Sequence, residues 1–315
     1  MSNQPLLDVI TYGEAMVMFV ATEFGELSEI NHFAKRAAGA ELNVAIGLAR
    51  LGLEVAWLSR VGHDSFGKFI LQQLAKENIH SELVTIDSRY PTGFQLKSKA
   101  VNGTDPAVEY FRKGSAASHL SLVDFNPDAF LNARHLHLSG VAAALSDSTY
   151  QLSLHFADFM RTAGKTVSFD PNLRPTLWKS EQEMVYHLNQ LAFKADWVLP
   201  GIKEGYILTG LTSSEAIADF YLEQGVKAVI IKLGEQGAYF KDHQGNQGTA
   251  PACFIENVVD TVGAGDGFAV GVISALLEGK TLQQAVERGN RIGSLAIQAI
   301  GDSEGLPNRA QLGEI

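Results

Sequence analysis

The stretch "DTVGAGDGF", residues 260–268, places a carboxylate, Asp266, directly after two glycines and directly before a long apolar run. If "ENVVD" ends a strand and a helix begins near Asp266, then Gly263, Ala264 and Gly265 form a turn at the positive end of the helix dipole. Glycines permit positive φ angles and let an anion approach the backbone closely. We therefore expect the unpaired amides of this turn to cradle an anion such as phosphate.

Asp266 itself has two interpretations. The carboxylate could cap the helix N-terminus, or it could be a base that accepts a proton from a substrate hydroxyl. In the second case the neighbouring amides would stabilise a transferring phosphoryl group. Spacing alone does not separate the two. The sequence contains no GxxxxGK[ST] and no GxGxxG after its first strand, so neither a Walker-type phosphate loop nor a dinucleotide site is expected.

The composition indicates a globular protein without nucleic-acid or membrane partners. The 315 residues are 46% hydrophobic and 19% charged, and the net charge of -10 argues against a phosphate-backbone binder. The longest apolar run, around "FAVGVISALL", is too short to cross a bilayer. The single cysteine, Cys253, cannot form an internal disulfide, and "MSNQPLLDVITYG" lacks the features of an export signal, so we expect a cytoplasmic protein.

Short β-rich runs alternate with helical patterns along the chain. The β-rich runs include "RHLHLSG" (134–140), "KTVSFD" (165–170), "DWVLPG" (196–201) and "KAVIIKLG" (227–234). The candidate helices are 41–52, 64–78, 148–163, 181–194, 213–224, 266–278 and 282–299, the last with Thr281 as its N-cap. This alternation predicts an α/β fold with a mostly parallel, doubly wound sheet, helices on both faces and ligands beyond the carboxyl ends of the strands.

One segment, 92–116, interrupts this alternation with two β-like arms around the turn-forming "NGTDP". A hairpin laid over the strand ends would exclude water from a site there, and its edge strands could pair with a second copy of the chain. We expect one domain over 1–315 with a small β lid formed mainly by about 14–22 and 92–118. A homodimer or higher homo-oligomer through this lid is the expected assembly.

The block "DTVGAGDGF" resembles the C-terminal signature of the ribokinase/PfkB carbohydrate kinase family. "AGAELNVAIGLARLG" (38–52) followed by "VGHDSFG" (61–67) is similar to the N-terminal signature of that family, although Ala38 stands where a glycine pair usually begins. The resemblance spans nearly the whole chain. It implies a ribokinase-like doubly wound α/β fold with a β lid.

Within that family, four further blocks are most similar to the 2-keto-3-deoxygluconate kinases. They are "EYFRKGSAAS" (109–118), "LHLSG" (136–140), "DPNLRPTLW" (170–178) and "GDSEGLP" (301–307). The resemblance implies ATP-dependent phosphorylation of 2-keto-3-deoxy-D-gluconate to 2-keto-3-deoxy-6-phosphogluconate. The alternatives are a fructokinase or another PfkB sugar kinase and, from a different class, a non-catalytic sugar- or nucleotide-binding regulator.

The resemblance also implies roles for single residues. Asp266 matches the catalytic base, and Gly263, Ala264 and Gly265 match the anion hole. The other implied substrate contacts are Gly39, Ala40, Asn43, Gln95, Tyr110, Arg112, Arg174 and Asp302. The implied ATP contacts are Asn172, Arg174, Lys232, Gly234, Gly237, Gly263 and Gly265. Glu204 matches a magnesium-associated residue that acts through water, and the implied cofactors are ATP and Mg²⁺, with a monovalent cation as a further candidate.

Two arginines at one site suit a substrate that carries a carboxylate, because a guanidinium offers a planar, bidentate fork. Each has a simpler alternative. Arg112 could be an ordinary edge-strand charge, and Arg174 could pair only with Asp170 or with an ATP phosphate. Asp302 could likewise be a plain turn residue.

Two departures from the family pattern concern the metal and the sugar. Gly201 stands where the magnesium-associated "NxxE" pattern has asparagine, and Gln95 stands where 2-keto-3-deoxygluconate kinases commonly have a tyrosine.

His135 and His137 lie at alternate positions of a β-rich run and would face the same side. Because no third ligand lies nearby in sequence, we expect them to pack in the protein and not to bind metal.

Overall fold

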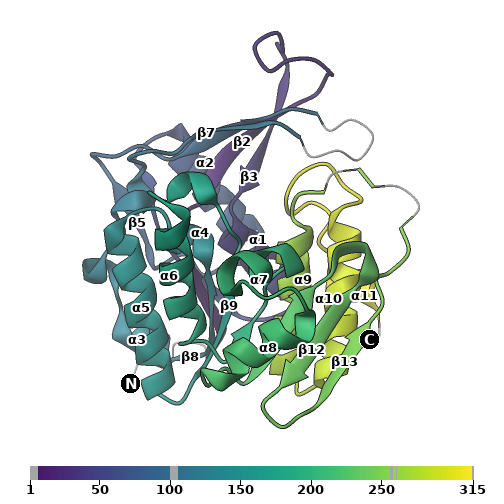
Figure 1. Ribbon diagram of the computed structural model, residues 1–315. Coiled ribbons are helices and arrows are strands. Elements are labelled where there is room, and N and C mark those ends of the chain that lie inside the picture. Colours follow the sequence, from purple (N-terminus) through teal and green to yellow (C-terminus); the bar gives the residue numbers. More distant parts are fainter. Residues whose placement is uncertain (1–5, 100–105, 256–257, 260, 314–315) are drawn as a thin grey trace.

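The computed structural model describes residues 6–99, 106–255, 258–259 and 261–313. Its centre is a nine-stranded sheet in the order β13-β12-β11-β10-β9-β8-β1-β4-β5 (Figure 1). The strands are β1 (Leu7–Tyr12), β4 (Val55–Gly62), β5 (Val84–Asp87), β8 (Ala133–Ser139), β9 (Thr166–Asp170), β10 (Trp197–Val198), β11 (Ala228–Lys232), β12 (Ala238–Asp242) and β13 (Gln247–Ala250). The pairs from β11 to β5 are parallel, whereas β12 and β13 pair antiparallel at one edge. The predicted mostly parallel sheet is confirmed.

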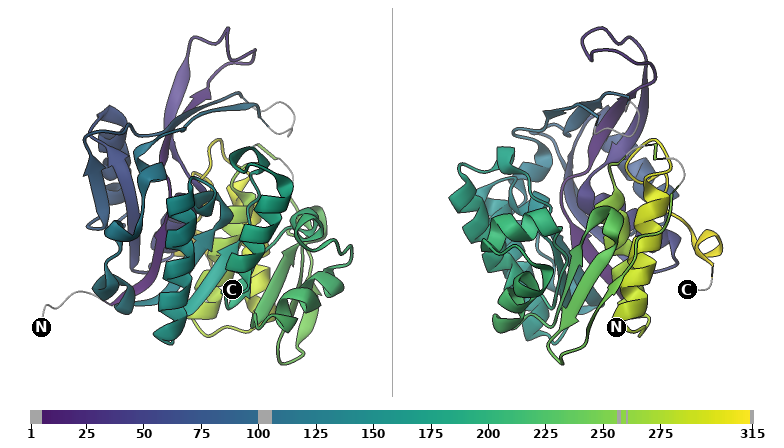
Figure 2. Two further views of the ribbon diagram at one scale, coloured as in Figure 1. Left: turned by 60° about the vertical axis from the view of Figure 1, so that its left-hand side comes forward. Right: turned by 45° about the vertical axis from the view of Figure 1, so that its right-hand side comes forward.

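Helices cover both faces of this sheet (Figure 2). Alternate residues of a strand point to opposite faces, so in β1 Ile10 and Tyr12 join one core and Val9 joins the other. On the first face pack α3 (Pro127–Leu131), α5 (Asp147–Thr162), α6 (Glu181–Ala192), α7 (Ile202–Thr209) and α8 (Ser214–Glu223). On the second pack α1 (Ala40–Arg50), α2 (Ser65–Lys76), α9 (Ala264–Leu277), α10 (Leu282–Ala296) and α11 (Arg309–Leu312). A short α4 (Gly140–Ala143) follows β8, and 3₁₀ turns lie at Ala116–His119, Leu122–Asp124, Pro175–Leu177 and Gly234–Gln236.

The seven helices predicted from the sequence are present, with ends that differ by at most three residues, and Thr281 caps α10 as expected. Sequence patterns missed α7 and the short α3, α4 and α11. The strand expected at "ENVVD" is wrong for the part that the structure describes. Val258 and Val259 are irregular and partly exposed, and β13 has already ended at Ala250.

A second sheet projects from the top of the molecule in Figure 1. It has the order β3-β2-β6-β7, with β2 at Met16–Ala21, β3 at Phe33–Ala38, β6 at Phe94–Lys97 and β7 at Val108–Phe111. We call these four strands the lid sheet. Its β6–β7 pair is the hairpin expected from 92–116, although residues 102–105 of the expected turn lie outside the described residues. The strand β3 was not expected.

The chain runs from β1 to β4 and β5 in one direction and from β8 to β11 in the other, so the strand order reverses between β1 and β8. In open α/β sheets, ligands bind beyond the carboxyl ends of the strands at such a point. The lid sheet lies over this edge of the main sheet (Figure 1). Among the described residues, no helix is both long enough and apolar enough to span a membrane.

Candidate active site

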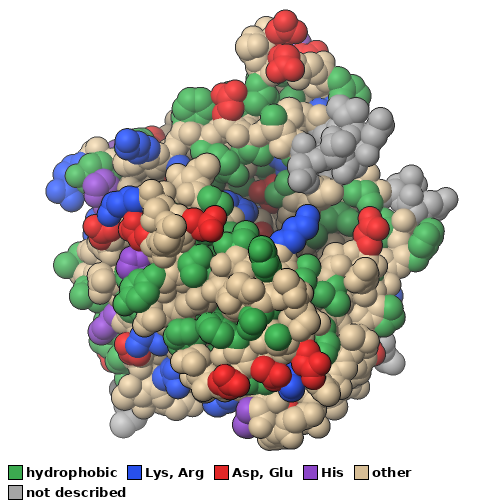
Figure 3. Space-filling view, viewed as in Figure 1, with side chains coloured by type: hydrophobic (Ala, Val, Ile, Leu, Met, Phe, Trp, Pro, Cys, Tyr) green, Lys and Arg blue, Asp and Glu red, His purple; other side chains and the backbone are tan. Residues whose placement is uncertain are grey.

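A cavity of about 380 Å³ lies at the carboxyl ends of β1, β8 and β9, beneath the lid sheet (Figure 3). Its walls also include the N-terminal ends of α1 and α9. Most of the predicted site residues line it: Gly39, Ala40, Asn43, Gln95, Tyr110, Arg112, Asn172, Arg174, Glu204, Lys232, Gly263, Ala264, Gly265, Asp266 and Asp302. Two predicted ATP contacts do not line it. Gly234 and Gly237 form the tight turn after β11, where both have positive φ angles.

Helix α9 begins at Ala264, two residues before the expected start, with Gly263 as its N-cap in the left-handed conformation (φ 87°). A Cβ at Gly263 would clash with the backbone carbonyl of Asp302, so both conformation and space require glycine. Ala264 and Gly265 therefore lie in the first helical turn, not in a turn before the helix as predicted. Among the described residues, nothing accepts a hydrogen bond from the backbone N–H groups of residues 263–265. Because the first N–H groups of a helix lack intrahelical acceptors, this end of α9 is suited to bind an anion.

Asp266 lies in the first turn of α9, where it is buried. Its Oδ2 accepts a hydrogen bond from Asn43 Nδ2 (2.7 Å), and its Oδ1 lies 3.5 Å from Asn172 Nδ2. The carboxylate makes no capping bond to its own helix, so the capping interpretation is wrong. Burial raises the pKa of Asp266 from 3.8 to about 8, with help from the Asp170 and Asp302 carboxylates and against the Asn43 bond and Arg174. A carboxyl that titrates near neutral pH can accept a proton from a hydroxyl during catalysis.

Asn43 lies on α1 and places a side-chain oxygen without a hydrogen-bond donor among the described residues at the cavity. Its Oδ1 atom is buried without a hydrogen-bond partner among the described residues, while its Nδ2 donates to Asp266. A buried amide oxygen usually has a donor, and a sugar hydroxyl in the cavity could supply one. Gly39, the N-cap of α1, has φ 150°, and a Cβ there would lie 2.5 Å from the carbonyl oxygen of Glu14. Glycine thus lets the start of α1 approach the segment after β1.

Arg112 enters the cavity from the end of the lid hairpin and is already paired. Its Nε donates to Glu14 Oε2 (2.6 Å), and the hydroxyl of Ser115 donates to the other Glu14 oxygen. Glu14 is buried directly after β1, so this ion pair joins the lid hairpin to the main sheet. The interpretation of Arg112 as an ordinary edge-strand charge is therefore wrong. Arg174, by contrast, is exposed at the cavity, and its NH1 donates only to the Leu173 carbonyl among the described residues.

The carboxyl ends of β9 and β11 carry groups that border α9. Lys232 Nζ donates to Asp170 Oδ2 (2.7 Å) and lies near Gly265, where a Cβ would stand 3.6 Å from it. Burial lowers the pKa of Lys232, but the Asp170 and Glu204 carboxylates outweigh burial and raise it, so this lysine stays charged. Asn172 has φ 38°, a rare conformation for a residue other than glycine that is often found at functional sites.

Glu204 has a structural role that the sequence did not suggest. Its Oε2 accepts from the N–H of Gly201 (2.7 Å), and its Oε1 accepts from the N–H of Leu173 (2.9 Å). The first bond caps helix α7, and the second fixes the backbone next to Arg174. Each carboxylate oxygen keeps a further lone pair for a water molecule.

The comparisons with known proteins agree with this geometry. The model of the pfkB family carbohydrate kinases matches residues 6–309. The chain belongs to the pfkB family of carbohydrate kinases. The sequence is 52% identical to a 2-dehydro-3-deoxygluconokinase of Bacillus subtilis (strain 168) over 307 residues, which cover 97% of this chain and 94% of the relative.

Solved structures show the same fold. The crystal structure of a PfkB protein from Polaromonas sp. JS666 is 51% identical and superposes with a TM-score of 0.90, covering 97% of this chain and 99% of that one. A putative ribokinase II from E. coli, solved in complex with ATP and Mg²⁺, is 25% identical with a TM-score of 0.89 and covers 98% of both chains. The ribokinase-like fold expected from the sequence is confirmed.

Several residues that line the cavity of this pfkB kinase were not predicted: Glu14, Met16, Ala38, Lys97, Val108, Val141, Asp170, Thr261 and Val262. Asp170 was considered only as a partner for Arg174, and its partner in the structure is Lys232. Glu14 carried a usable signal, because a glycine and a charged residue directly after the first buried strand mark a strand end where ligands bind. Lys97 carried none, since its partner Asp302 lies 205 positions away.

His135 and His137 pack inside the protein as predicted. Both are buried, and both form a hydrogen bond with the hydroxyl of Ser168. The distances to Ser168 Oγ are 2.8 Å from His135 Nε2 and 2.9 Å from His137 Nδ1. Burial lowers the pKa of His137 to about 3, so its imidazole is neutral at physiological pH.

Proposed function

We propose that this chain transfers the γ-phosphoryl group of ATP to the terminal hydroxyl of 2-keto-3-deoxygluconate and releases 2-keto-3-deoxy-6-phosphogluconate and ADP. The observation that carries the proposal is that a buried carboxyl, a helix N-terminus and an exposed arginine line one cavity beneath the lid sheet. Within the described part of the chain, the first N–H groups of that helix have no acceptor. The 52% identity to a 2-dehydro-3-deoxygluconokinase supports the same substrate, since a 2-dehydro sugar acid is a 2-keto acid.

In this mechanism Asp266 accepts the proton of the attacking hydroxyl. The hydroxyl oxygen then bonds to the γ-phosphorus while the bond from that phosphorus to the β–γ bridging oxygen breaks. The amides of Gly263, Ala264 and Gly265 donate to the oxygens of the phosphoryl group as their charge spreads in the transition state. Asn43 orients the sugar through its unfilled Oδ1 and holds Asp266 through its Nδ2. Most of the rate enhancement would then come from positioning and from electrostatic stabilisation.

The residues around the start of α9 fit a nucleoside triphosphate. The N–H groups at the start of α9 and the charged Lys232, whose Nζ lies near Gly265, would hold the phosphates, and Asn172 and Arg174 border the same region. Mg²⁺, carried by the nucleotide, supplies charge neutralisation. Among the described residues, no cluster of three or more Asp, Glu, His or Cys side chains could hold a metal. The phosphates would therefore be the main ligands of Mg²⁺, with Glu204 acting through water. A separate prediction is the monovalent cation, which a titration of the reaction rate with K⁺ would test.

The acid specificity would rest on Arg174 and on the remaining N–H groups of Arg112. Glu14 already compensates the charge of Arg112, so the sequence argument for two equivalent carboxylate-binding arginines needs revision. We propose that Arg174 supplies the uncompensated charge and that Arg112 supplies a fixed hydrogen-bond donor. Gln95 and Tyr110, which face each other across the β6–β7 pair, would contact the sugar from the lid.

We further propose a single catalytic unit over residues 1–315 that works in the cytoplasm, where its ATP is found, and assembles as a homodimer. The two edge strands of the lid sheet, β3 and β7, support the dimer because unpaired strand edges can pair with another chain. Phe111 exposes 47% of its surface on β7, which a partner would cover. Light scattering after size-exclusion chromatography tests this assembly.

The test of the function is ADP release from ATP and Mg²⁺ with a matched panel of acceptors. The panel contains 2-keto-3-deoxygluconate, its galactonate epimer, the regioisomer with the keto group at C5 and the deoxy carbon at C2, 3-deoxyfructose and fructose. The acid and 3-deoxyfructose differ only at C1, so their ratio isolates the carboxylate. We expect the highest kcat/KM for 2-keto-3-deoxygluconate. Preference for fructose would establish a fructokinase instead, and nucleotide binding without turnover of any acceptor would establish a binding protein.

A further inference from the structure

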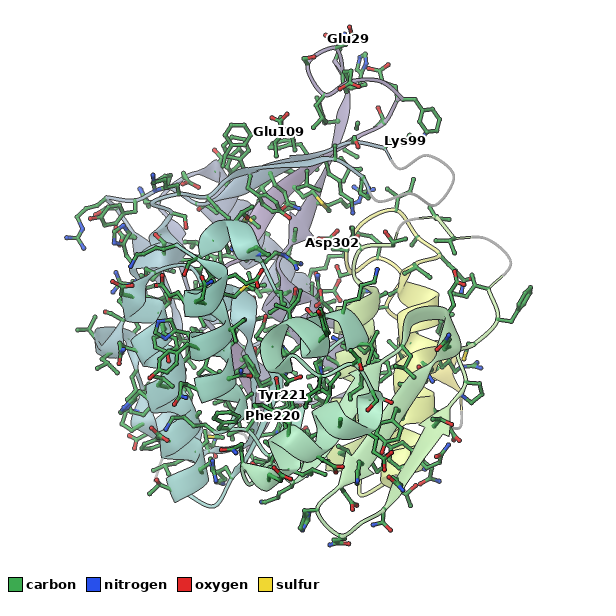
Figure 4. The ribbon with its side chains drawn as sticks, viewed as in Figure 1. Glu29, Lys99, Glu109, Phe220, Tyr221 and Asp302 are labelled. Carbon is green, nitrogen blue, oxygen red and sulfur yellow. The ribbon has the colours of Figure 1, made fainter. Side chains whose placement is uncertain are left out.

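Two cations of the lid sheet face one loop of the main domain. Lys97 Nζ, on β6, lies 2.9 Å from Asp302 Oδ1, and Arg36 Nε, on β3, lies 3.1 Å from Glu304 Oε1. Both acids belong to residues 301–306, which we call the C-terminal loop. In Figure 4, Asp302 lies between the lid, marked by Glu109 and Lys99, and the body of the molecule.

The Lys97–Asp302 pair is buried. The two side chains expose 1% and 8% of their surfaces, so water screens their attraction poorly. Breaking a buried pair by removing one partner is far more disruptive than breaking a surface pair, because the other charge stays buried and uncompensated. The Arg36–Glu304 pair, with 41% and 32% exposed, is the weaker of the two.

The pairing with Asp302 also argues against a direct role of Lys97 in binding the substrate carboxylate. Lys97 lines the cavity and could have been a third carboxylate-binding cation. Its charge is instead compensated by Asp302, and both groups come from segments that must approach each other when the lid lies over the cavity. The geometry therefore favours a role in holding the lid over a role in binding the acid directly.

The C-terminal loop is fixed on its other side as well. Arg50 of α1 donates to the carbonyl oxygens of Ser303 (2.7 Å) and Leu306 (3.0 Å) and is itself held by both carboxylate oxygens of Glu77. The backbone of Asp302 packs directly against Gly263, the N-cap of the anion-binding helix. The loop thus lies between the lid sheet and α9, and it contacts both.

We propose that Lys97 and Arg36 are positioning residues: together with Asp302 and Glu304 they latch the lid sheet onto the C-terminal loop and so keep the sugar site closed beside the anion-binding end of α9. The kinetic consequence rests on the proposed function, whereas the latch itself does not. Opening the latch should weaken binding of the acceptor and expose the lid, without removing any group that touches the transferring phosphoryl.

The first experiment measures lid opening without any substrate. Hydrogen exchange followed by mass spectrometry compares the wild type with Lys97→Met and Lys97→Arg. We expect the amides of β6, β7 and the C-terminal loop to exchange on the order of tenfold faster in Lys97→Met, with Lys97→Arg close to the wild type, because arginine retains the charge and the reach. Exchange in the buried strands β8 and β9 should not change.

The second experiment uses the weaker pair, since neither Arg36 nor Glu304 lines the active-site cavity. The variants are Arg36→Glu, Glu304→Arg and the double charge swap. Each single variant should raise the KM of the acceptor roughly twofold to fivefold, and the double variant should return toward the wild-type KM. Additive defects in the double variant would show that the two side chains do not act as a pair.

A pH profile separates the latch from a simple packing defect. The groups that face Asp266 are Asn43 from α1, Asp170 and Asn172 from the end of β9, Lys232 from the end of β11, Arg174 and Asp302. Lys97→Met takes a cation away from Asp302, whose carboxylate raises the pKa of Asp266, so this variant should move the acid limb of kcat/KM to higher pH, while the Arg36 variants should not. The KM of Lys97→Met should rise more than its kcat falls.

The latch is wrong if Lys97→Met exchanges its lid amides at the wild-type rate, or if the charge swap adds the two single defects instead of cancelling them. An inactive wild type would instead refute the proposed function, and the exchange experiment would still decide the latch. Loss of protection throughout both sheets in Lys97→Met would point to misfolding. In that case normal lid exchange in the Arg36 and Glu304 variants would count against the latch.

Discussion

Replacing Asp266 by asparagine should abolish most of the turnover and leave the site intact. Asparagine keeps an oxygen that can accept the hydrogen bond from Asn43 Nδ2, which is 2.7 Å long in the structure. It cannot accept the proton of the acceptor hydroxyl. A positioned base contributes about 10²- to 10⁴-fold to a rate, so kcat should fall by that factor while the KM values for acceptor and ATP change little.

The same substitution should stabilise the protein at high pH. Burial raises the pKa of Asp266 from 3.8 to about 8, so the folded protein holds the proton more tightly than the unfolded chain. The stability of the wild type is therefore highest below pH 4 as far as this group is concerned and falls as pH rises toward 8. Each pH unit in that window costs about 1.4 kcal/mol, which gives on the order of 6 kcal/mol in total. The helix N-terminus opposes this by only about 0.3–1 kcal/mol, which is too little to reverse the sign.

The assay is urea unfolding of the wild type and Asp266→Asn between pH 5 and 9, with Asp147→Asn as a control. Asp147 also lies in the first turn of a helix, but its side chain is 96% exposed, so the control should follow the wild type at every pH. The difference between Asp266→Asn and the wild type should grow with pH up to about 8 and then level off. A difference that stays constant over this range, or a variant that retains near-normal kcat, would refute the assignment of Asp266 as a buried base.

Three further predictions follow from single contacts. Gly263→Ala should lose roughly 1–3 kcal/mol of stability in urea unfolding because of its positive φ and a backbone clash, whereas Gly265→Ala, whose Cβ would make only an ordinary contact with Lys232 Nζ at 3.6 Å, should lose less than about 1 kcal/mol. Glu204→Ala should lose about 1–3 kcal/mol because two backbone N–H groups lose their acceptor, and Glu204→Gln about half of that. The Mg²⁺ concentration for half-maximal rate should rise only a fewfold in Glu204→Gln. Arg174→Ala should raise the KM of the acid tenfold or more without a change in thermal stability, whereas Arg112→Ala should also destabilise the fold by about 3–5 kcal/mol because it leaves a buried carboxylate unpaired.

The main sheet and its helices could be predicted because their signals are local. Five of the seven predicted helices begin at a residue whose side chain caps them: α2, α5, α6, α8 and α10. The strand β11 is a short apolar run, and β8 and β9 place Leu136 and Leu138, and Val167 and Phe169, at alternate positions. The strand β3 could not be predicted, since "FAKRAA" has neither alternation nor β-branched residues and becomes a strand only by pairing with β2. The opposite error occurred at Val258 and Val259. Their β-branched side chains suggested a strand, yet both are partly exposed in an irregular segment.

The candidate site was predictable where one short motif carries its own geometry. The glycines before Asp266 indicated a helix N-terminus that binds anions, and the error of two residues in the start of α9 changed which backbone groups are helical but not where they point. The charge pairs of the site were not predictable. Glu14 and Arg112 are 98 positions apart, and Lys97 and Asp302 are 205 apart, so only the folded chain shows that these cations are already compensated.

Compensation of the other cations makes acid recognition depend on the lid. Arg174 is exposed, and a pair of unit charges about 4 Å apart is worth only about 1 kcal/mol in water but about 4 kcal/mol at the effective dielectric of a partly buried site. Arg174 can therefore distinguish the acid strongly from its neutral analogue only while the lid excludes water. Lys97→Met, which should open the lid, ought to lower the ratio of kcat/KM for 2-keto-3-deoxygluconate over 3-deoxyfructose by about 10²-fold, whereas Lys97→Arg should preserve it. If Lys97→Met instead lowered both values of kcat/KM equally, Arg174 would bind phosphate and the carboxylate would be recognised elsewhere.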